Sequence, residues 1–372
     1  MKYYIIAGEA SGDLHGANLM KEVYKKDSRA DIRFWGGDLM QAAGGTLVSH
    51  YKERAFMGFL EVLKNLFKVL GFIKFCKKDI AGFTPDVIVF IDNSGFNLRV
   101  AKWAKEQGFK TNYYISPQVW ASRAGRVKDI KRDLDKVFVI LPFEKEFYKK
   151  YDCEVSFVGH PLIDAIADRT QVSEASFREE HALSTKKIIA LLPGSRKQEI
   201  TKMLSVMLSL TADFSDYQFV IAGAPSQDFS FYKEIMGTRE VAFINNKTYD
   251  LLSVSYAALV ASGTATLETA LFKVPQVVCY KGGYISYQIA KRIITLKFIS
   301  LVNLILDKEA VKELIQDDFN KQNLKAALLN ILDDAYREKM FLNYFDLEKQ
   351  LGGKGASKNV ASQIVATLKS NI

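Results

Sequence analysis

The sequence contains little cysteine and little histidine. Cys76, Cys153 and Cys279 are far apart and form no C-x-x-C pair, which argues against a disulfide framework or a structural zinc site. The 4 histidines also lack metal-ligand spacing. We therefore expect a protein of a reducing compartment without a zinc centre.

Long apolar runs are missing as well. The apolar run at the N-terminus, from Tyr3 to Ala7, is shorter than the core of a signal peptide, which needs roughly 7–15 residues. No uninterrupted apolar stretch reaches the ~18 residues that a membrane-spanning helix requires. The sequence therefore predicts a cytoplasmic protein that is not integral to a membrane.

Acidic residues are outnumbered by basic ones. The chain has 51 Lys and Arg against 42 Asp and Glu, a net charge of +9. Such a charge attracts anions, including nucleotides, sugar phosphates, acidic lipids and nucleic acids, but it does not distinguish among them.

The order of the sequence patterns predicts two α/β domains. At 372 residues the chain is long for one core, since single cores stop growing at roughly 250–300 residues. Short β-rich runs alternate with helical stretches on both sides of a polar segment, which is typical of doubly wound parallel sheets. We expect an N-terminal domain over 1–165, a second domain over 166–340, and a helical tail over 341–372 that packs back on another domain or on a second subunit.

The first strand ends in a glycine-spaced turn, "AGEASGDLHG". Gly8, Gly12 and Gly16 stand four residues apart, and no lysine follows them. This spacing fits neither the dinucleotide fingerprint nor the P-loop. The turn is therefore not expected to hold a nucleotide.

Two later strand-to-helix turns are better candidates for a phosphate. In "LLPGSRKQE", Gly194, Ser195 and Arg196 combine free amides at a helix start with a guanidinium. A capping box of Ser195 with Gln198 would explain the serine but not the arginine. The sequence therefore favours phosphate binding at this turn.

The turn "ASGTATLE" repeats this arrangement. Ser262, Gly263 and Thr264 precede a helix that carries Glu268. Hydroxyls and amides suit a diphosphate and a carboxylate can bind ribose hydroxyls, although an ordinary helix cap with an acid near the helix start would look the same. Two such turns in one domain favour a nucleotide crevice.

In the N-terminal domain, "DVIVFIDNSGFN" places Asp92 at the end of an apolar strand. A partly desolvated carboxylate there suits a general base for a hydroxyl nucleophile. The same residue could equally cap the next turn, so spacing alone leaves both roles open.

Two basic and apolar segments are candidates for lipid or phosphate contact. In residues 56–76, 14 of 21 side chains are apolar, more than a core-facing stripe requires, and a helix buried on both sides is the alternative to a membrane-surface helix. In residues 280–306, Arg292 is a candidate for phosphate contact, against a solvated helix face. The expected membrane contacts of the first segment are Met57, Phe59, Leu63, Lys64, Phe67 and Lys68.

Eight motifs follow one another along nearly the whole chain. They are "AGEASGD" 7–13, "MGFLEV" 57–62, "IDNSGFN" 91–97, "YISPQVWASR" 114–123, "LPFEKEFY" 141–148, "VGHPL" 158–162, "LLPGSRKQE" 191–199 and "ASGTATLE" 261–268. In this order they resemble the motifs of the lipid-A-disaccharide synthase family, glycosyltransferase family 19. The resemblance implies a GT-B architecture, in which two Rossmann-like domains face a cleft.

The resemblance also implies an activity. Such enzymes transfer a 2,3-diacylglucosamine unit from its UDP derivative to 2,3-diacylglucosamine 1-phosphate, which yields the β(1→6) lipid A disaccharide and UDP. They are cytoplasmic, attach peripherally to the inner membrane, and need no metal or other cofactor. The expected partners are therefore the UDP-diacylglucosamine donor, the acylated acceptor and an anionic membrane surface but no nucleic acid, and a homodimer is left open.

With this resemblance, the candidate residues take roles in an inverting transfer. Asp92 would take the proton from the acceptor 6-hydroxyl, the two turns with Arg196 and Arg292 would hold the UDP diphosphate, and Glu268 would hold the ribose. The first turn would face the acceptor phosphate through Ser11 and the amides near Gly12, or it would line the cleft without touching phosphate. Further candidates in that turn are Glu9 and His15.

The chain departs from the family pattern at one informative place. Where the family commonly has a second acid three residues after the aspartate, this chain has Gly95, so only Asp92 can act as the carboxylate. Two other functions stay open on the sequence alone: a UDP-sugar 2-epimerase of the same fold, and a peripheral lipid-binding protein without enzymatic activity.

Overall fold

A computed structural model describes residues 1–54, 66–283 and 297–370, which divide into two compact units, Met1–Asp164 with Leu351–Ile372 and Ala165–Gln350. Met57, Phe59, Leu63, Lys64 and Arg292 lie outside the described residues. In the described part of the chain, no helix combines the length and the apolar character needed to cross a bilayer.

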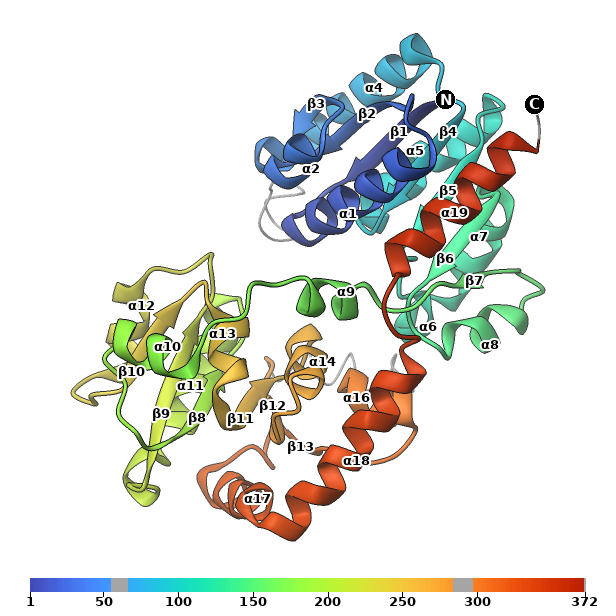
Figure 1. The fold of residues 1–372 in the computed structure, drawn as a ribbon. Helices are drawn as coiled ribbons and strands as arrows, with labels where there is room; N and C mark the ends of the chain where they lie inside the picture. Colours follow the sequence, from blue (N-terminus) through green and yellow to red (C-terminus); the bar gives the residue numbers. More distant parts are fainter. Residues whose placement is uncertain (55–65, 284–296, 371–372) are drawn as a thin grey trace. The chain divides into compact units, whose positions relative to one another are not determined.

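The first unit is built on a parallel sheet with the strand order β3-β2-β1-β4-β5-β6-β7 (Figure 1). Its strands are β1 (Lys2–Ala7), β2 (Asp31–Gly36), β3 (Thr46–His50), β4 (Val87–Ile91), β5 (Thr111–Tyr114), β6 (Lys136–Val139) and β7 (Ser156–Phe157). Its helices are α1 (Ala10–Lys26), α2 (Asp38–Ala43), α4 (Leu66–Phe83), α5 (Ser94–Glu106), α6 (Val119–Ser122), α7 (Val127–Asp133), α8 (Glu144–Lys149) and α19 (Ala356–Lys369), with short 3₁₀ turns at Tyr51–Arg54 and Ala124–Arg126.

The second unit repeats this plan with the strand order β10-β9-β8-β11-β12-β13. Its strands are β8 (Lys187–Leu192), β9 (Tyr217–Gly223), β10 (Ala242–Asn245), β11 (Ser255–Ala261), β12 (Gln276–Tyr280) and β13 (Lys312–Ile315). The helix α9 (Pro161–Ala167) leads into it, and its other helices are α10 (Glu174–Glu180), α11 (Lys197–Leu208), α12 (Phe229–Met236), α13 (Thr248–Ser253), α14 (Thr264–Leu271), α16 (Leu301–Leu306), α17 (Lys321–Leu332) and α18 (Asp334–Gln350), with a 3₁₀ turn at Thr211–Asp213.

Strand composition explains both sheets. The central strand β4, "VIVFI", is buried at every position, and β1 is buried after its first residue. Parallel strands covered by helices on both faces need such continuous apolar runs. The prediction of two doubly wound α/β domains is therefore confirmed.

In both sheets the strand order reverses at one place. From β1 the chain continues through β2 and β3 to one edge of the first sheet, and from its neighbour β4 it continues to the opposite edge. In the second sheet, β8 and β11 are related in the same way. Open α/β sheets bind their ligands outside the carboxyl ends of the strands at such a switch point. The turns after these four strands are the ones that carry Glu9, Asp92, Ser195 and Ser262.

The four-residue glycine spacing of the first turn serves close packing. A Cβ on Gly16 would come within 2.5 Å of the Met40 sulfur, and one on Gly8 would come within 2.0 Å of the Asn93 side chain. Only glycine lets α1 lie so near α2 and lets the turn after β1 touch the turn after β4. This finding explains why the motif matches no nucleotide-binding fingerprint.

Helix α1 is also tied to the start of α2 by the buried carboxylate of Asp13. It accepts hydrogen bonds from the backbone N–H groups of Gly37, Leu39 and Met40 at 2.7, 3.0 and 3.0 Å. These groups include amides at a helix N-terminus that would otherwise lack partners. On the same side of the sheet α19 packs along α1 (Figure 1), with Val360, Ala361 and Ile364 in the same apolar core.

Candidate active site

In the first unit, Asp92 lies directly after β4 in a left-handed backbone conformation. Its φ is 46° and that of Asn93 is 45°, a region that Asp and Asn tolerate better than other non-glycine residues. The Asp92 carbonyl accepts hydrogen bonds from Asn97 Nδ2 at 2.8 Å and from the Tyr113 hydroxyl. The backbone turn that presents the carboxylate is therefore held by two neighbouring side chains.

The Asp92 carboxyl has an unusual environment. Its side chain keeps an exposed surface, yet the surrounding protein atoms displace much of its water. This desolvation raises the pKa of Asp92 above its ordinary value, and a hydrogen bond from the Asn93 backbone opposes the rise. A carboxylate that is open to a substrate and binds a proton more strongly than usual is suited to general base catalysis.

The acceptor-side candidates lie at the same switch point. Glu9 precedes α1 as its N-cap residue, and Ser11 is exposed in the first turn of that helix. Gly12 is buried, and a Cβ added there would lie only 3.2 Å from the Cβ of Ala7. Glu9 and Ser11 follow Gly8, which lies against Asn93, closely in the chain. Gly12 instead allows the close packing of α1 on β1.

His15 differs from what a phosphate ligand would need. Burial lowers its pKa to about 4, and the pKa of His160 is lowered to about 3, first by burial and then by the proximity of the His15 imidazole, beside which a second protonated ring would be repelled. Both imidazoles are consequently neutral at physiological pH. The His160 Nδ1 accepts a hydrogen bond from the Leu162 backbone N–H at 3.2 Å, so it also helps to shape the turn after β7.

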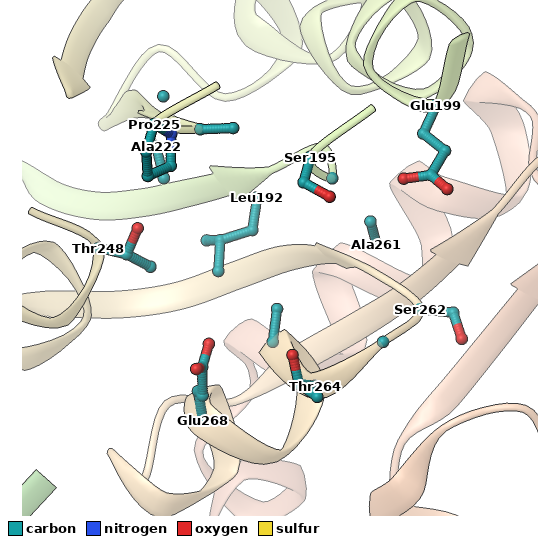
Figure 2. A pocket seen from close by; sticks show the side chains of 15 residues that line it. Leu192, Ser195, Glu199, Ala222, Pro225, Thr248, Ala261, Ser262, Thr264 and Glu268 are labelled. Carbon is teal, nitrogen blue, oxygen red and sulfur yellow. The ribbon is translucent and has the colours of Figure 1, made fainter. Parts of the chain in front are cut away.

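In the second unit, the turns after β8, β9 and β11 enclose a pocket of about 230 Å³ (Figure 2). Gly194 at φ 108° and Gly263 at φ 157° adopt conformations that favour glycine, and both residues line the pocket. Figure 2 shows Ser195, Thr264 and Glu268 around one hollow. The lining residues are Leu192, Gly194, Ser195, Glu199, Ala222, Gly223, Ala224, Pro225, Thr248, Ala261, Ser262, Gly263, Thr264, Ala265 and Glu268.

Glu268 is the main charged group on the α14 side of this pocket. Burial raises its pKa above the ordinary value, and a hydrogen bond from Tyr249 opposes the rise. The Tyr249 hydroxyl donates to Glu268 Oε1 at 2.9 Å. The carboxylate is thus fixed at the pocket wall with acceptor capacity left for hydroxyl groups of a ligand.

Arg196 lies beside this pocket instead of lining it. Its side chain is 83% exposed and pairs with Glu199 through Nη1 and Oε1 at 3.1 Å. It lines an adjoining pocket of about 300 Å³ together with Lys197, Lys202 and Lys281. The two pockets share Glu199 and Ser262, so a positive region adjoins the cavity formed by the glycine-containing turns.

A family profile described as "Lipid-A-disaccharide synthetase" matches residues 3–365. The chain belongs to the lipid-A-disaccharide synthase family. The lipid-A-disaccharide synthase of Syntrophus aciditrophicus is 38% identical over 375 residues, which cover 98% of this chain and 97% of the relative. That of Coxiella burnetii is 35% identical over 365 residues and covers 97% of this chain and 96% of its own. The predicted membership in the lipid-A-disaccharide synthase family is confirmed.

Solved structures support the fold of this lipid-A-disaccharide synthase family member. The UDP-GlcNAc 2-epimerase of Neisseria meningitidis, bound to UDP-GlcNAc, superposes with a TM-score of 0.70 at 14% identity over 100% of both chains. A glycosyltransferase of kitacinnamycin superposes with a TM-score of 0.65 at 11% identity over 99% of both chains. At such low identity the likeness shows the fold alone, and the predicted GT-B fold is confirmed. The sequence relatives, not the epimerases, identify the family.

Three side chains that the sequence did not single out bind candidate site residues: Asn97 and Tyr113 bind the Asp92 carbonyl, and Tyr249 binds Glu268. Asn97 is buried on α5, and a polar residue on the apolar face of a helix is a signal that could have been used. Tyr113 and Tyr249 lie 21 and 19 residues from the groups they bind. No local sequence pattern connects residues at these separations, so the two hydrogen bonds become apparent only in the folded structure.

Proposed function

We propose that this chain condenses UDP-2,3-diacylglucosamine with 2,3-diacylglucosamine 1-phosphate to give the β(1→6) lipid A disaccharide 1-phosphate and UDP. The observation that supports this proposal most is the family match over residues 3–365, which coincides with candidate sites at both switch points. The first unit would bind the acceptor, and the second would bind the UDP-sugar. A homodimer stays a prediction.

In the proposed reaction, Asp92 takes the proton from the acceptor 6-hydroxyl. The oxygen attacks the anomeric carbon from the face opposite UDP, its new bond forms as the bond to the diphosphate breaks, and the configuration inverts. Amides and hydroxyls of Ser195 and Thr264, with Arg196, stabilise the negative charge that develops on the departing diphosphate. Ser262 differs from the expectation, because its backbone N–H donates to the Cys279 carbonyl at 2.9 Å and its hydroxyl donates to the Ile299 carbonyl at 3.1 Å. Ser11 is the candidate for the acceptor phosphate, and neutral His15 can contribute a hydrogen bond but no positive charge.

An activity assay tests this function. Protein given UDP-2,3-diacylglucosamine and the 1-phosphate acceptor is expected to release UDP and to form a disaccharide only when both are present. UDP release without the acceptor, or conversion of the donor into a 2-epimer, would contradict the proposal and favour an epimerase. Lipid binding without any turnover would favour a carrier protein.

We further propose that α4 attaches the enzyme peripherally to the anionic inner membrane. Phe67, Leu70 and Phe75 are 88%, 49% and 46% exposed, and Lys68 and Lys74 are exposed beside them. Apolar side chains flanked by lysine suit a lipid surface, where each basic residue contributes about 1 kcal/mol. The described part of the predicted membrane contact, Phe67 and Lys68, lies on this helix.

Replacing Phe67 and Leu70 by glutamate is expected to reduce sedimentation with vesicles that contain acidic phospholipid, because the charges oppose both apolar contact and the negative surface. The matched control replaces Leu342 and Phe345 on α18, which are 67% and 58% exposed. Equal binding by the two double variants and the unchanged protein would contradict membrane attachment through α4.

A further inference from the structure

We propose that Tyr249 is a positioning residue that holds Glu268 in the orientation needed to accept hydrogen bonds from the ribose hydroxyls of the donor nucleotide, and that this pair makes the pocket select ribonucleotides over deoxyribonucleotides. The inference rests on the proposed function, because it names how the same pocket recognises UDP. Its structural basis is the 2.9 Å hydrogen bond from the Tyr249 hydroxyl to Glu268 Oε1.

The acceptor capacity of Glu268 fits a sugar with two neighbouring hydroxyls. An ionised carboxylate offers about four lone-pair sites on its two oxygens. Tyr249 occupies one of them and leaves room for two further donors, while the carboxylate is directed towards the pocket lined by Leu192 and Thr264 (Figure 2). The 2′- and 3′-hydroxyls of ribose are such a pair of donors.

The hydroxyl of Tyr249 is well suited to hold a carboxylate. Burial, followed by the charge of Glu268, raises the pKa of Tyr249 far above its ordinary value, so the group stays protonated as a donor. The hydrogen bond in turn lowers the pKa of Glu268 against the effect of burial. The hydrogen bond from Tyr249 therefore favours the ionised acceptor, in opposition to burial, which favours the neutral acid.

Tyr249 is itself fastened to the surrounding helices. Its ring packs on Phe272 with a centroid distance of 5.4 Å. The Arg169 guanidinium lies 4.9 Å from the centre of the Phe272 ring and pairs with Asp250 at 3.2 Å. The start of α13 and the end of α14 are thus joined through one arginine, which limits the movement of Tyr249 relative to Glu268.

The test compares UDP with 2′-deoxy-UDP in titration calorimetry on the full chain. The change Tyr249→Phe keeps the ring and its contact with Phe272 but removes the donor. We expect UDP to bind about tenfold more weakly because a hydrogen bond to a charged group is lost, whereas 2′-deoxy-UDP changes much less. The ratio of the two dissociation constants therefore falls towards one. Tyr336→Phe, the same chemical change on α18, should leave this ratio unaltered.

A second variant separates orientation from general loosening. Glu268→Leu, which removes both acceptor oxygens, should also abolish the preference for UDP, and the double variant should lose no more preference than Glu268→Leu alone, because both changes act on one interaction. An unchanged ratio in Tyr249→Phe, or equal losses for both nucleotides, would overturn the positioning role. Failure of the unaltered protein to bind UDP would instead refute the proposed function.

Discussion

Asp92→Asn is expected to lower the rate of disaccharide formation by about 10²–10⁴-fold, the range that a positioned general base contributes. Asparagine cannot take the proton from the acceptor hydroxyl at neutral pH. UDP affinity should stay unchanged, because the described residues that line the proposed donor pocket all belong to the second unit. Turnover assays combined with UDP titration measure the two effects separately.

The structure explains why this substitution isolates the carboxylate. Asn97 and Tyr113 donate to the backbone carbonyl of Asp92, not to its side chain, so the turn keeps these bonds in the variant. Asparagine also tolerates the left-handed conformation. Asp152→Asn is a matched control, since Asp152 is exposed and has a φ of 51° in the same unit, and it should retain full activity.

The pH dependence follows from the sign of the pKa shift. Desolvation raises the pKa of Asp92, and the base acts only when ionised, so activity should fall as the pH decreases through this raised value. The residual activity of Asp92→Asn should lack that step. A raised carboxyl pKa also means that stability is lost as the pH rises through it, so the variant should unfold at an equal or higher temperature at neutral pH. Full activity in Asp92→Asn, or an unchanged acid step, would contradict the role of Asp92 as the base.

Local pattern was enough to predict the strands that carry the site. Runs such as "DVIVFID" and "IIALLPGSR" are apolar for a whole strand and end in polar or glycine residues, and the structure places β4 and β8 there. Sequence alone does not give strand order. Two features of the structure depend on pairing between strands that are far apart in the chain: Gly8 lies against Asn93, and Ser195 and Ser262 line one pocket.

The burial of individual side chains is a second property that the local sequence pattern does not predict. His15 has the residue type of a phosphate ligand, yet desolvation keeps its imidazole neutral. The sequence predicts a helical tail that packs back on another domain or on a second subunit, but it does not identify the segment on which the tail packs, which is α1 of the first unit. Both properties arise from contacts between segments separated by long stretches of sequence.

Arg196→Met is expected to lower kcat by about 10²–10³-fold, the usual effect of removing one donor that stabilises transition-state charge. The side chain is 83% exposed, and within the described part of the chain it pairs with Glu199 at 3.1 Å. Such an exposed pair contributes at most about 1 kcal/mol, so the guanidinium can leave Glu199 for a diphosphate at little cost. The free energy of unfolding should therefore change by only about 0.5 kcal/mol.

The chemistry of the guanidinium makes this prediction specific. Lysine keeps the charge but not the two-pronged donor geometry, so Arg196→Lys should recover only part of the lost rate. Arg239→Met is the control, because Arg239 is exposed in the same unit and its bond goes to a backbone carbonyl, that of Met236. If Arg196→Met keeps kcat and raises only KM for the donor, then Arg196 binds the ground state and does not assist departure of UDP.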